Sequence, residues 1–169
     1  MALPDAETLL AEVAAQIQRG AGAGIALIGI YTGGVWIAER LRQILALSDP
    51  IGTIDVAFYR DDYKKTGLRP GVRPSDIPFP VENAHIVLVD DVLYTGRTIR
   101  AALNEIFDYG RPASIRLAAL VDRGGRELPI CPQFVGAVLE VGSDQTIELH
   151  REGPEARFTL ALVAARNQS

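Results

Sequence analysis

The sequence predicts an α/β protein with a central, mostly parallel sheet that is flanked by helices. Short apolar runs of strand length alternate with segments of helical spacing along the chain. The runs at 25–30, 86–89 and 114–121 are largely apolar without alternation, which is typical of strands buried on both faces of a parallel sheet. Ligands of such sheets bind outside the carboxyl ends of the strands. We therefore expect a ligand site at that edge.

The N-terminal part of the chain predicts helices and strands in alternation. Residues 5–19 place apolar side chains at helical spacing, with Asp5 as the N-cap, and the glycines that follow end the helix. A strand at 25–30, a turn, a helix at 35–47 and a strand at 54–59 come next in order.

The C-terminal part continues this pattern and then changes to short strands. The helix after strand 86–89 ends near Gly110, and its expected buried residues are Ile99, Leu103, Ile106 and Phe107. Strand 114–121 follows. The remaining strand-like pieces, which we expect to form a small hood over the site, lie around 135–141, 146–149 and 157–164.

Composition limits the class of protein. The chain has 169 residues, of which 48% are hydrophobic and 22% charged, and this is ordinary for a globular domain. It has no apolar run long enough to span a membrane and no basic leader, so we expect a cytoplasmic protein. A single cysteine, Cys131, excludes an internal disulfide. The net charge of −4 argues against broad, non-specific binding to nucleic acid.

The most informative segment is His85–Thr98, which reads HIVLVDDVLYTGRT. Asp90 and Asp91 stand where the strand is expected to end, and a turn containing Gly96 leads into the next helix. Carboxylates can accept hydrogen bonds from two neighbouring sugar hydroxyls. Backbone N–H groups at the start of a helix bind phosphate. The segment therefore predicts a site for a ribose phosphate.

This segment resembles the phosphoribosyl-pyrophosphate (PRPP) loop of type I phosphoribosyltransferases. Together with the following IRAALNEIFDYGRPASIRLAALVDRGGRELPI, it closely resembles the PyrR family, the bifunctional uracil phosphoribosyltransferases and pyrimidine-operon regulators. The resemblance extends from about residue 25 to residue 130. It implies the type I phosphoribosyltransferase fold in one domain, 1–169. It also implies conversion of uracil and PRPP to UMP and pyrophosphate in pyrimidine salvage, by a homodimer or homotetramer.

The residue pattern and the resemblance together predict roles for particular residues. Asp90, Asp91 and Arg60 are the expected catalytic residues, and Mg²⁺ is the expected cofactor. It would be held mainly by PRPP oxygens, with the two aspartates as candidates to bind it through water. The expected PRPP-binding residues are Asp90, Asp91, Val92, Leu93, Tyr94, Thr95, Gly96, Arg97 and Thr98. The expected pyrophosphate-binding residues are Tyr31, Thr32, Gly33 and Arg60, and the expected uracil-binding residues, partly through backbone groups, are Val121, Asp122 and Arg123.

Two positions depart from related patterns. Many PyrR sequences carry Thr-Arg-Gly where this chain has Thr32-Gly33-Gly34. Because the arginine is absent here, another residue must neutralise the negative charge of the pyrophosphate. Arg60 is the best candidate, although a surface ion pair with a neighbouring aspartate is the alternative. At the position of Tyr94, relatives that act on 6-oxopurines carry an aspartate that manages a purine proton. A neutral phenol there argues against a purine substrate.

Residues 63–80 differ in character from the rest of the chain. They contain four prolines and several basic residues, which is typical of an exposed segment outside the core. We expect this segment to act as a lid over the phosphates, with a solvated charged loop as the alternative. The basic residues concerned are Lys64, Lys65, Arg69 and Arg73.

A second function is the alternative to catalysis alone. PyrR proteins also bind messenger RNA in response to UMP, through a basic surface on the N-terminal helix and the late strands. Here that helix carries Asp5, Glu7 and Glu12 before its first basic residue, Arg19, and the segment 141–149 is acidic. RNA affinity comes largely from neutralising phosphates. The sequence therefore predicts weak RNA binding, unless Arg97, Arg100, Arg111 and Arg116 form a basic surface.

Overall fold

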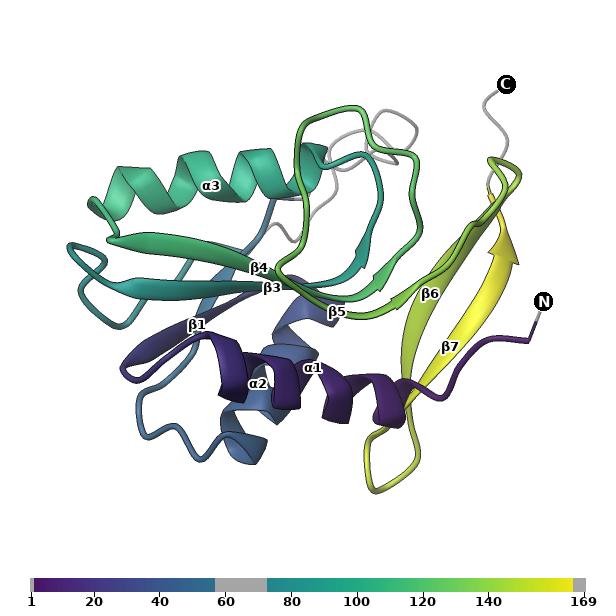
Figure 1. Ribbon diagram of the computed structural model, residues 1–169, viewed down its shortest axis with the longest axis horizontal. Coiled ribbons are helices and arrows are strands. Elements are labelled where there is room, and N and C mark those ends of the chain that lie inside the picture. Colours follow the sequence, from purple (N-terminus) through teal and green to yellow (C-terminus); the bar gives the residue numbers. More distant parts are fainter. Residues whose placement is uncertain (1, 57–72, 166–169) are drawn as a thin grey trace.

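Five parallel strands form the central sheet of the computed structural model, which describes residues 2–56 and 73–165. Their order across the sheet is β2-β1-β3-β4-β5, and every neighbouring pair is parallel (Figure 1). The strands are β1 (Ile25–Ile30), β2 (Gly52–Ile54), β3 (His85–Leu93), β4 (Ser114–Asp122) and β5 (Phe134–Val138). The predicted parallel sheet is confirmed.

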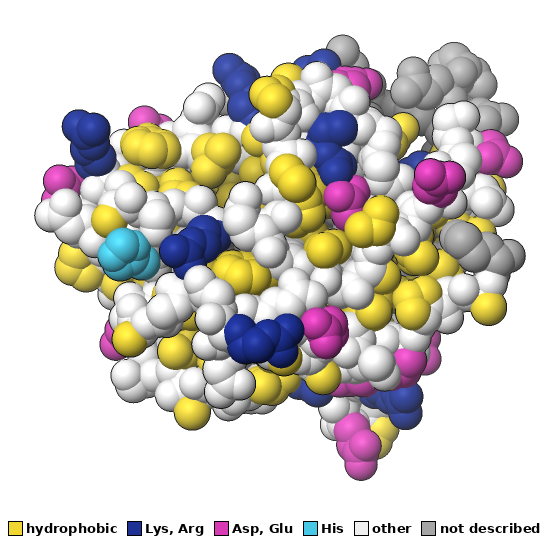
Figure 2. Space-filling view, in the orientation of Figure 1, with side chains coloured by type: hydrophobic (Ala, Val, Ile, Leu, Met, Phe, Trp, Pro, Cys, Tyr) yellow, Lys and Arg dark blue, Asp and Glu magenta, His cyan; other side chains and the backbone are white. Residues whose placement is uncertain are grey.

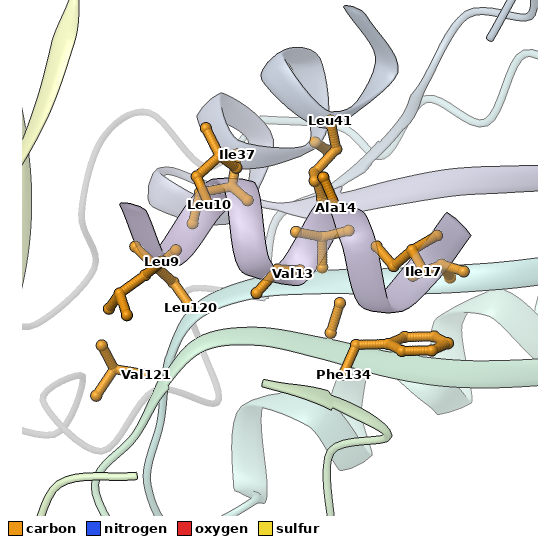
Figure 3. Packing of buried hydrophobic residues seen from close by; sticks show 14 of the residues in the cluster. Leu9, Leu10, Val13, Ala14, Ile17, Ile37, Leu41, Leu120, Val121 and Phe134 are labelled. Atoms are coloured by element: carbon orange, nitrogen blue, oxygen red, sulfur yellow. The ribbon is translucent and has the colours of Figure 1, made fainter. Parts of the chain in front are cut away.

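Helices cover both faces of this sheet (Figure 1). On one face lie α1 (Ala6–Gly20) and α2 (Gly33–Ile44), and on the other lies α3 (Arg97–Tyr109). Figure 3 shows how apolar side chains of α1 fill the space between α2 and strands β4 and β5. A second cluster of buried residues lies between α3 and the other face of the sheet. This double covering explains why β1 and residues 86–89 of β3 lack polar side chains.

An antiparallel hairpin, β6 (Gln145–Glu152) and β7 (Arg157–Ala164), stands apart from the central sheet and matches two of the three strands expected for the hood. The third prediction, around 135–141, was wrong, because that segment forms β5 and pairs with β4 in the central sheet. The hairpin is fastened to the helical layer through Phe158, which is buried. The N–H of Phe158 donates to Glu7 Oε1 at 2.8 Å, and Arg40 of α2 forms an ion pair with Glu7 at 2.7 Å. The Arg40 guanidinium also lies 5.1 Å from the centre of the Phe158 ring. One glutamate of α1 thus joins α2 to the hairpin.

Two predicted boundaries in the first half were wrong. Helix α2 begins at Gly33 rather than residue 35 and ends at Ile44. Strand β2 covers Gly52–Ile54, so Asp55 and Val56 lie outside it, while 57–59 fall outside the described residues. The pairing explains this start, because β2 aligns with β1 from Gly52 opposite Ile28 to Ile54 opposite Ile30.

Two further predictions in the second half were wrong. Strand β3 continues through both aspartates to Leu93, because it stays paired with β4 as far as Leu93 opposite Asp122. Phe107 is 57% exposed rather than buried. The buried stripe of α3 runs through Ile99, Ala102 and Ile106, and a residue directly after Ile106 turns about 100° away from it.

Candidate active site

Three loops lie at the carboxyl edge of the sheet. They are the β1–α2 turn, the β3–α3 loop and the segment that follows β4. Figure 1 shows the start of α3 and the segment after β4 on the same side of the molecule, near the hairpin. Because β1, β3 and β4 are adjacent and parallel, their carboxyl ends necessarily meet. The predicted site residues that the structure describes are brought to one edge of the sheet in this way.

The β1–α2 turn lies tightly against β3. A Cβ atom on Gly34 would be 2.4 Å from the Val89 carbonyl oxygen, and one on Gly33 would be 2.2 Å from Asp91 Oδ2. Only glycine permits these approaches. The peptide bond between Tyr31 and Thr32 is cis. The contacts of Gly33 and Gly34 place the first turn of α2, whose N–H groups have no partner within the helix, beside the acidic end of β3.

Asp90 and Asp91 point to opposite faces of the sheet. Side chains alternate along a strand, and Asp91 lies on the α2 side, where its carboxylate meets Gly33. Asp90 is 5% exposed and projects toward the α3 side. Each carboxylate accepts the N–H of the next residue, Asp91 N–H at 3.0 Å and Val92 N–H at 2.9 Å. The pair therefore places one carboxylate on each face of the sheet, with Asp91 beside the start of α2.

The β3–α3 loop forms a cradle for an anion. Gly96 has φ 92° and is the N-cap of α3, and as a glycine it has no side chain with which to cap the helix. The N–H of Arg97 donates to the buried Thr95 Oγ1 at 3.2 Å, while Thr98 is half-buried. An N-terminus of this kind binds phosphate through its N–H groups and the helix dipole.

The end of β4 is tied to the β3–α3 loop. Arg123 N–H donates to the Leu93 carbonyl at 3.0 Å, and the Arg123 guanidinium stacks 4.0 Å from the centre of the Tyr94 ring. Asp122 accepts from Gly124 N–H at 3.0 Å and from Arg126 Nη2 at 2.6 Å. The Asp122 carboxylate therefore organises the loop after β4, and Tyr94 and Arg123 form one stacked unit beside it.

Arg126 is a residue of this site that sequence reasoning missed. Its guanidinium donates to Asp122, to the Ile130 carbonyl at 2.8 Å, and through Nη1 to the Tyr94 carbonyl. The four-residue spacing of Asp122 and Arg126 was a weak signal for an ion pair, but no pattern in the sequence shows that the same guanidinium reaches the loop after β3.

Of the basic residues predicted to lie around the phosphates, the structure describes Arg73. Arg60, Lys64, Lys65 and Arg69 lie outside the described residues. The guanidinium of Arg73 lies 4.5 Å from the centre of the Tyr31 ring. Its N–H donates to Asp55 Oδ2, just after β2, at 3.0 Å. Arg73 thus lies beside the β1–α2 turn.

The aspartate pair suits a water-mediated Mg²⁺ better than a protein cage. No group of three or more metal-binding side chains occurs within residues 2–56 and 73–165. Mg²⁺ keeps several waters and takes phosphate oxygens readily. Asp90 and Asp91 therefore fit a metal that arrives with a diphosphate substrate.

Comparison with known proteins identifies the family. Residues 2–145 match the model of the phosphoribosyl transferase domain. The chain belongs to the phosphoribosyltransferase family. Within it, the chain is 51% identical over 160 residues to "Bifunctional protein PyrR" of Pseudomonas paraeruginosa, covering 92% of this chain and 94% of that protein. The protein of the same name from Nitrosococcus oceani is 58% identical over 132 residues, covering 77% of this chain and 73% of the relative. The predicted PyrR resemblance is confirmed.

Solved structures confirm the phosphoribosyltransferase fold. A hypoxanthine-guanine phosphoribosyltransferase from Bacillus anthracis matches with a TM-score of 0.66 at 21% identity, covering 83% of this chain and 84% of that one. A purine phosphoribosyltransferase from Pyrococcus horikoshii matches with a TM-score of 0.62 at 25% identity, covering 80% and 83%. No helix among the described residues is long and apolar enough to cross a membrane.

Proposed function

We propose that this chain transfers the phosphoribosyl group of PRPP to uracil, giving UMP and pyrophosphate with Mg²⁺ as cofactor. One observation carries the proposal: Asp90 and Asp91 lie near the end of β3 on opposite faces of the sheet, with the start of α2 against Asp91, and the loop that follows β3 leads into the start of α3. PRPP has the matching layout, a ribose with a phosphate at one end and a diphosphate at the other.

The proposed reaction needs positioning and electrostatics more than covalent catalysis. The bond from ribose C1 to the pyrophosphate oxygen breaks, and a bond from C1 to uracil N1 forms as that nitrogen loses its proton. Positive charge develops on the ribose in the transition state, so the fixed carboxylates of Asp90 and Asp91 stabilise it. Backbone N–H groups within residues 95–98, other than that of Arg97, which donates to Thr95 Oγ1, hold the 5′-phosphate, and this keeps C1 in line with the base.

The leaving pyrophosphate is assigned to residues 31–33 and the start of α2. Its negative charge is favoured at a helix N-terminus. Arg73 lies on the Tyr31 ring beside this turn and is a cation available from the described residues, in addition to the expected Arg60. A guanidinium can bind a phosphate through two parallel hydrogen bonds.

Uracil is assigned to the end of β4, at residues Val121–Arg123. The stacking of Arg123 on Tyr94 supports this assignment, because it places a neutral ring beside the end of β4 at the position where relatives that act on 6-oxopurines carry an aspartate. A 6-oxopurine would lack the aspartate expected to manage its proton. Arg123 N–H already donates to Leu93, so we assign base recognition here to other backbone groups near Val121 and Arg123.

The test is a parallel assay of PRPP with uracil, hypoxanthine, guanine, adenine and orotate, with and without Mg²⁺. We expect Mg²⁺-dependent formation of UMP from uracil, and turnover of each purine at least about a hundredfold slower, as for a site whose buried polar groups stay unpaired with the wrong base. Faster turnover of any purine than of uracil would overturn the substrate assignment.

RNA-binding regulation is the second candidate function, favoured by the word "bifunctional" in the name of the PyrR relatives. Its surface is not evident on the face shown in Figure 2, where basic side chains are scattered with acidic ones among them. For the molecule as a whole we propose a cytoplasmic enzyme in which residues 1–169 form one domain that acts as a homodimer or homotetramer.

A further inference from the structure

The segment 126–130 is attached to every residue of the loop 94–97. The Thr95 carbonyl accepts from Glu127 N–H at 3.0 Å and Leu128 N–H at 3.1 Å. The Tyr94 carbonyl accepts from Arg126 Nη1. A Cβ on Gly96 would lie 3.0 Å from Ile130 Cγ1, and Arg97 Nε donates to Glu127 Oε2 at 2.7 Å. The loop is therefore held along its whole length from one side.

Arg126 connects this segment to the sheet. Its side chain is 23% exposed and its partner Asp122 is 11% exposed. One guanidinium joins the end of β4 through Asp122, the end of the segment through the Ile130 carbonyl, and the loop after β3 through the Tyr94 carbonyl. Its planar group presents several donors in a fixed geometry, which suits three acceptors from three directions.

This attachment determines where the N–H groups of the loop point. In a planar trans peptide the C=O and the following N–H point in opposite directions, and the peptides of this loop are trans. Because the carbonyls of Tyr94 and Thr95 face segment 126–130, the N–H groups of Thr95 and Gly96 must face away from it. That is the side of the loop to which the 5′-phosphate is assigned.

We propose that Arg126 is a positioning residue for the phosphate loop: it holds the Tyr94 carbonyl so that the N–H groups of the loop are oriented for the 5′-phosphate before substrate arrives. This inference rests on the proposed function and deepens it. Donors that are oriented in advance avoid the entropy cost of ordering the loop on binding. A residue that only stabilised the fold would instead affect all parts of the site alike.

The test compares Arg126→Ala with Arg126→Lys and with a matched control, Arg19→Ala, which removes an exposed arginine at the far end of α1. Titration calorimetry measures affinity for two probes: UMP, which uses the phosphate loop, and magnesium pyrophosphate, which uses the β1–α2 turn. Steady-state kinetics give kcat and KM for PRPP. Thermal unfolding shows whether each variant is folded.

We expect Arg126→Ala to bind UMP about tenfold or more weakly and to raise KM for PRPP similarly, as for the loss of a hydrogen bond from a charged group. Pyrophosphate affinity should stay within about twofold, because the β1–α2 turn does not contact Arg126. Arg126→Lys should recover only part of the UMP affinity. Added guanidinium should restore part of the UMP affinity of Arg126→Ala, at concentrations too low to change the UMP affinity of Arg19→Ala.

Unchanged UMP affinity in Arg126→Ala would overturn the inference, and so would equal losses for UMP and pyrophosphate. If Arg126→Ala does not fold, Arg126→Lys is judged by the same comparison of the two probes. Wild-type protein that binds neither UMP nor PRPP would instead contradict the proposed function itself.

Discussion

Single glycine residues set how closely the start of α2 approaches the acidic pair on β3. Gly34 and Gly33 let α2 touch β3 at Val89 and Asp91, where any side chain would collide with backbone or carboxylate atoms. Gly29 has the same role inside β1, because a Cβ there would be 2.6 Å from Val35 Cα. The close approach of Gly33 to Asp91 explains why the chain has glycine at position 33. An arginine at this position would require Asp91 to move.

The acidic pair is the first residue-level prediction. Replacing Asp90 and Asp91 together with Asn should lower kcat about a hundredfold or more, because negative charge near the developing ribose cation is lost. The fold should survive, since an Asn side-chain oxygen can still accept the N–H bonds that Asp91 and Val92 donate. Turnover and thermal unfolding of the double variant are the measurements.

The two single variants serve as controls, because each leaves one carboxylate in place. Activity in the double variant close to that of wild type, with the protein fully folded, would mean that the pair has only a structural role.

At the level of elements, α1 carries the hairpin as well as covering the sheet. Its N-cap, Asp5, accepts hydrogen bonds from the Thr8 hydroxyl and N–H, both at 2.9 Å, and from Arg157 at the start of β7 at 3.0 Å. The hydroxyl of Thr8, followed by its N–H and by Arg157, lowers the pKa of the Asp5 carboxyl below 3.8. The cap of one helix thus also anchors the hood.

This cap makes the stability of the N-terminal region depend on pH. Because the pKa of Asp5 is lower in the folded state, its contribution is present above the unfolded value of 3.8 and is lost as pH falls through the folded pKa. Asp5→Ala should therefore lower Tm at pH 7, and the difference from wild type should shrink below pH 3.8. Asp5→Asn, which keeps a capping oxygen but no charge, is the matched control. A Tm difference for Asp5→Ala that is constant across this range would contradict the assignment.

At the scale of the whole molecule, charge bears on the second activity. The net charge is −4, and the early part of α1 is acidic. Two of the arginines that could form a basic surface are used within the protein: Arg97 pairs with Glu127, and Arg116 donates to the Gly20 carbonyl at 2.7 Å. Fewer free basic groups mean fewer RNA phosphates neutralised.

We therefore expect weak binding to a pyrimidine-operon leader hairpin, without preference over a scrambled RNA. The measurement is a titration with both RNAs in the presence of UMP, at low and near-physiological salt. Binding tighter than about micromolar that survives the higher salt and prefers the hairpin would defeat this expectation, since non-specific complexes are weaker than this. The RNA surface would then have to be assembled between subunits, with Arg100, Arg111 and Arg116 as candidates.

The sequence by itself determined the architecture and the location of the site. Continuous apolar runs predicted buried parallel strands, and β1 has the predicted bounds. HIVLVDDVLYTGRT predicted the strand, the acidic pair and the helix start, because neighbouring residues form that unit. The predicted end of β3 was wrong. Pairing with β4 continues the strand through two polar residues, Asp90 and Asp91, where the local sequence pattern predicted that the strand ends.

Only the tertiary structure decided which distant residues complete the site. The contact of Gly33 with Asp91, the stacking of Arg123 on Tyr94 and the bond from Arg126 to the Tyr94 carbonyl each join segments that are far apart in the chain. Periodicity and propensity describe interactions between near neighbours along the chain. The side chain that meets a given carbonyl across two loops depends on strand order and register, and these become fixed only when the sheet forms.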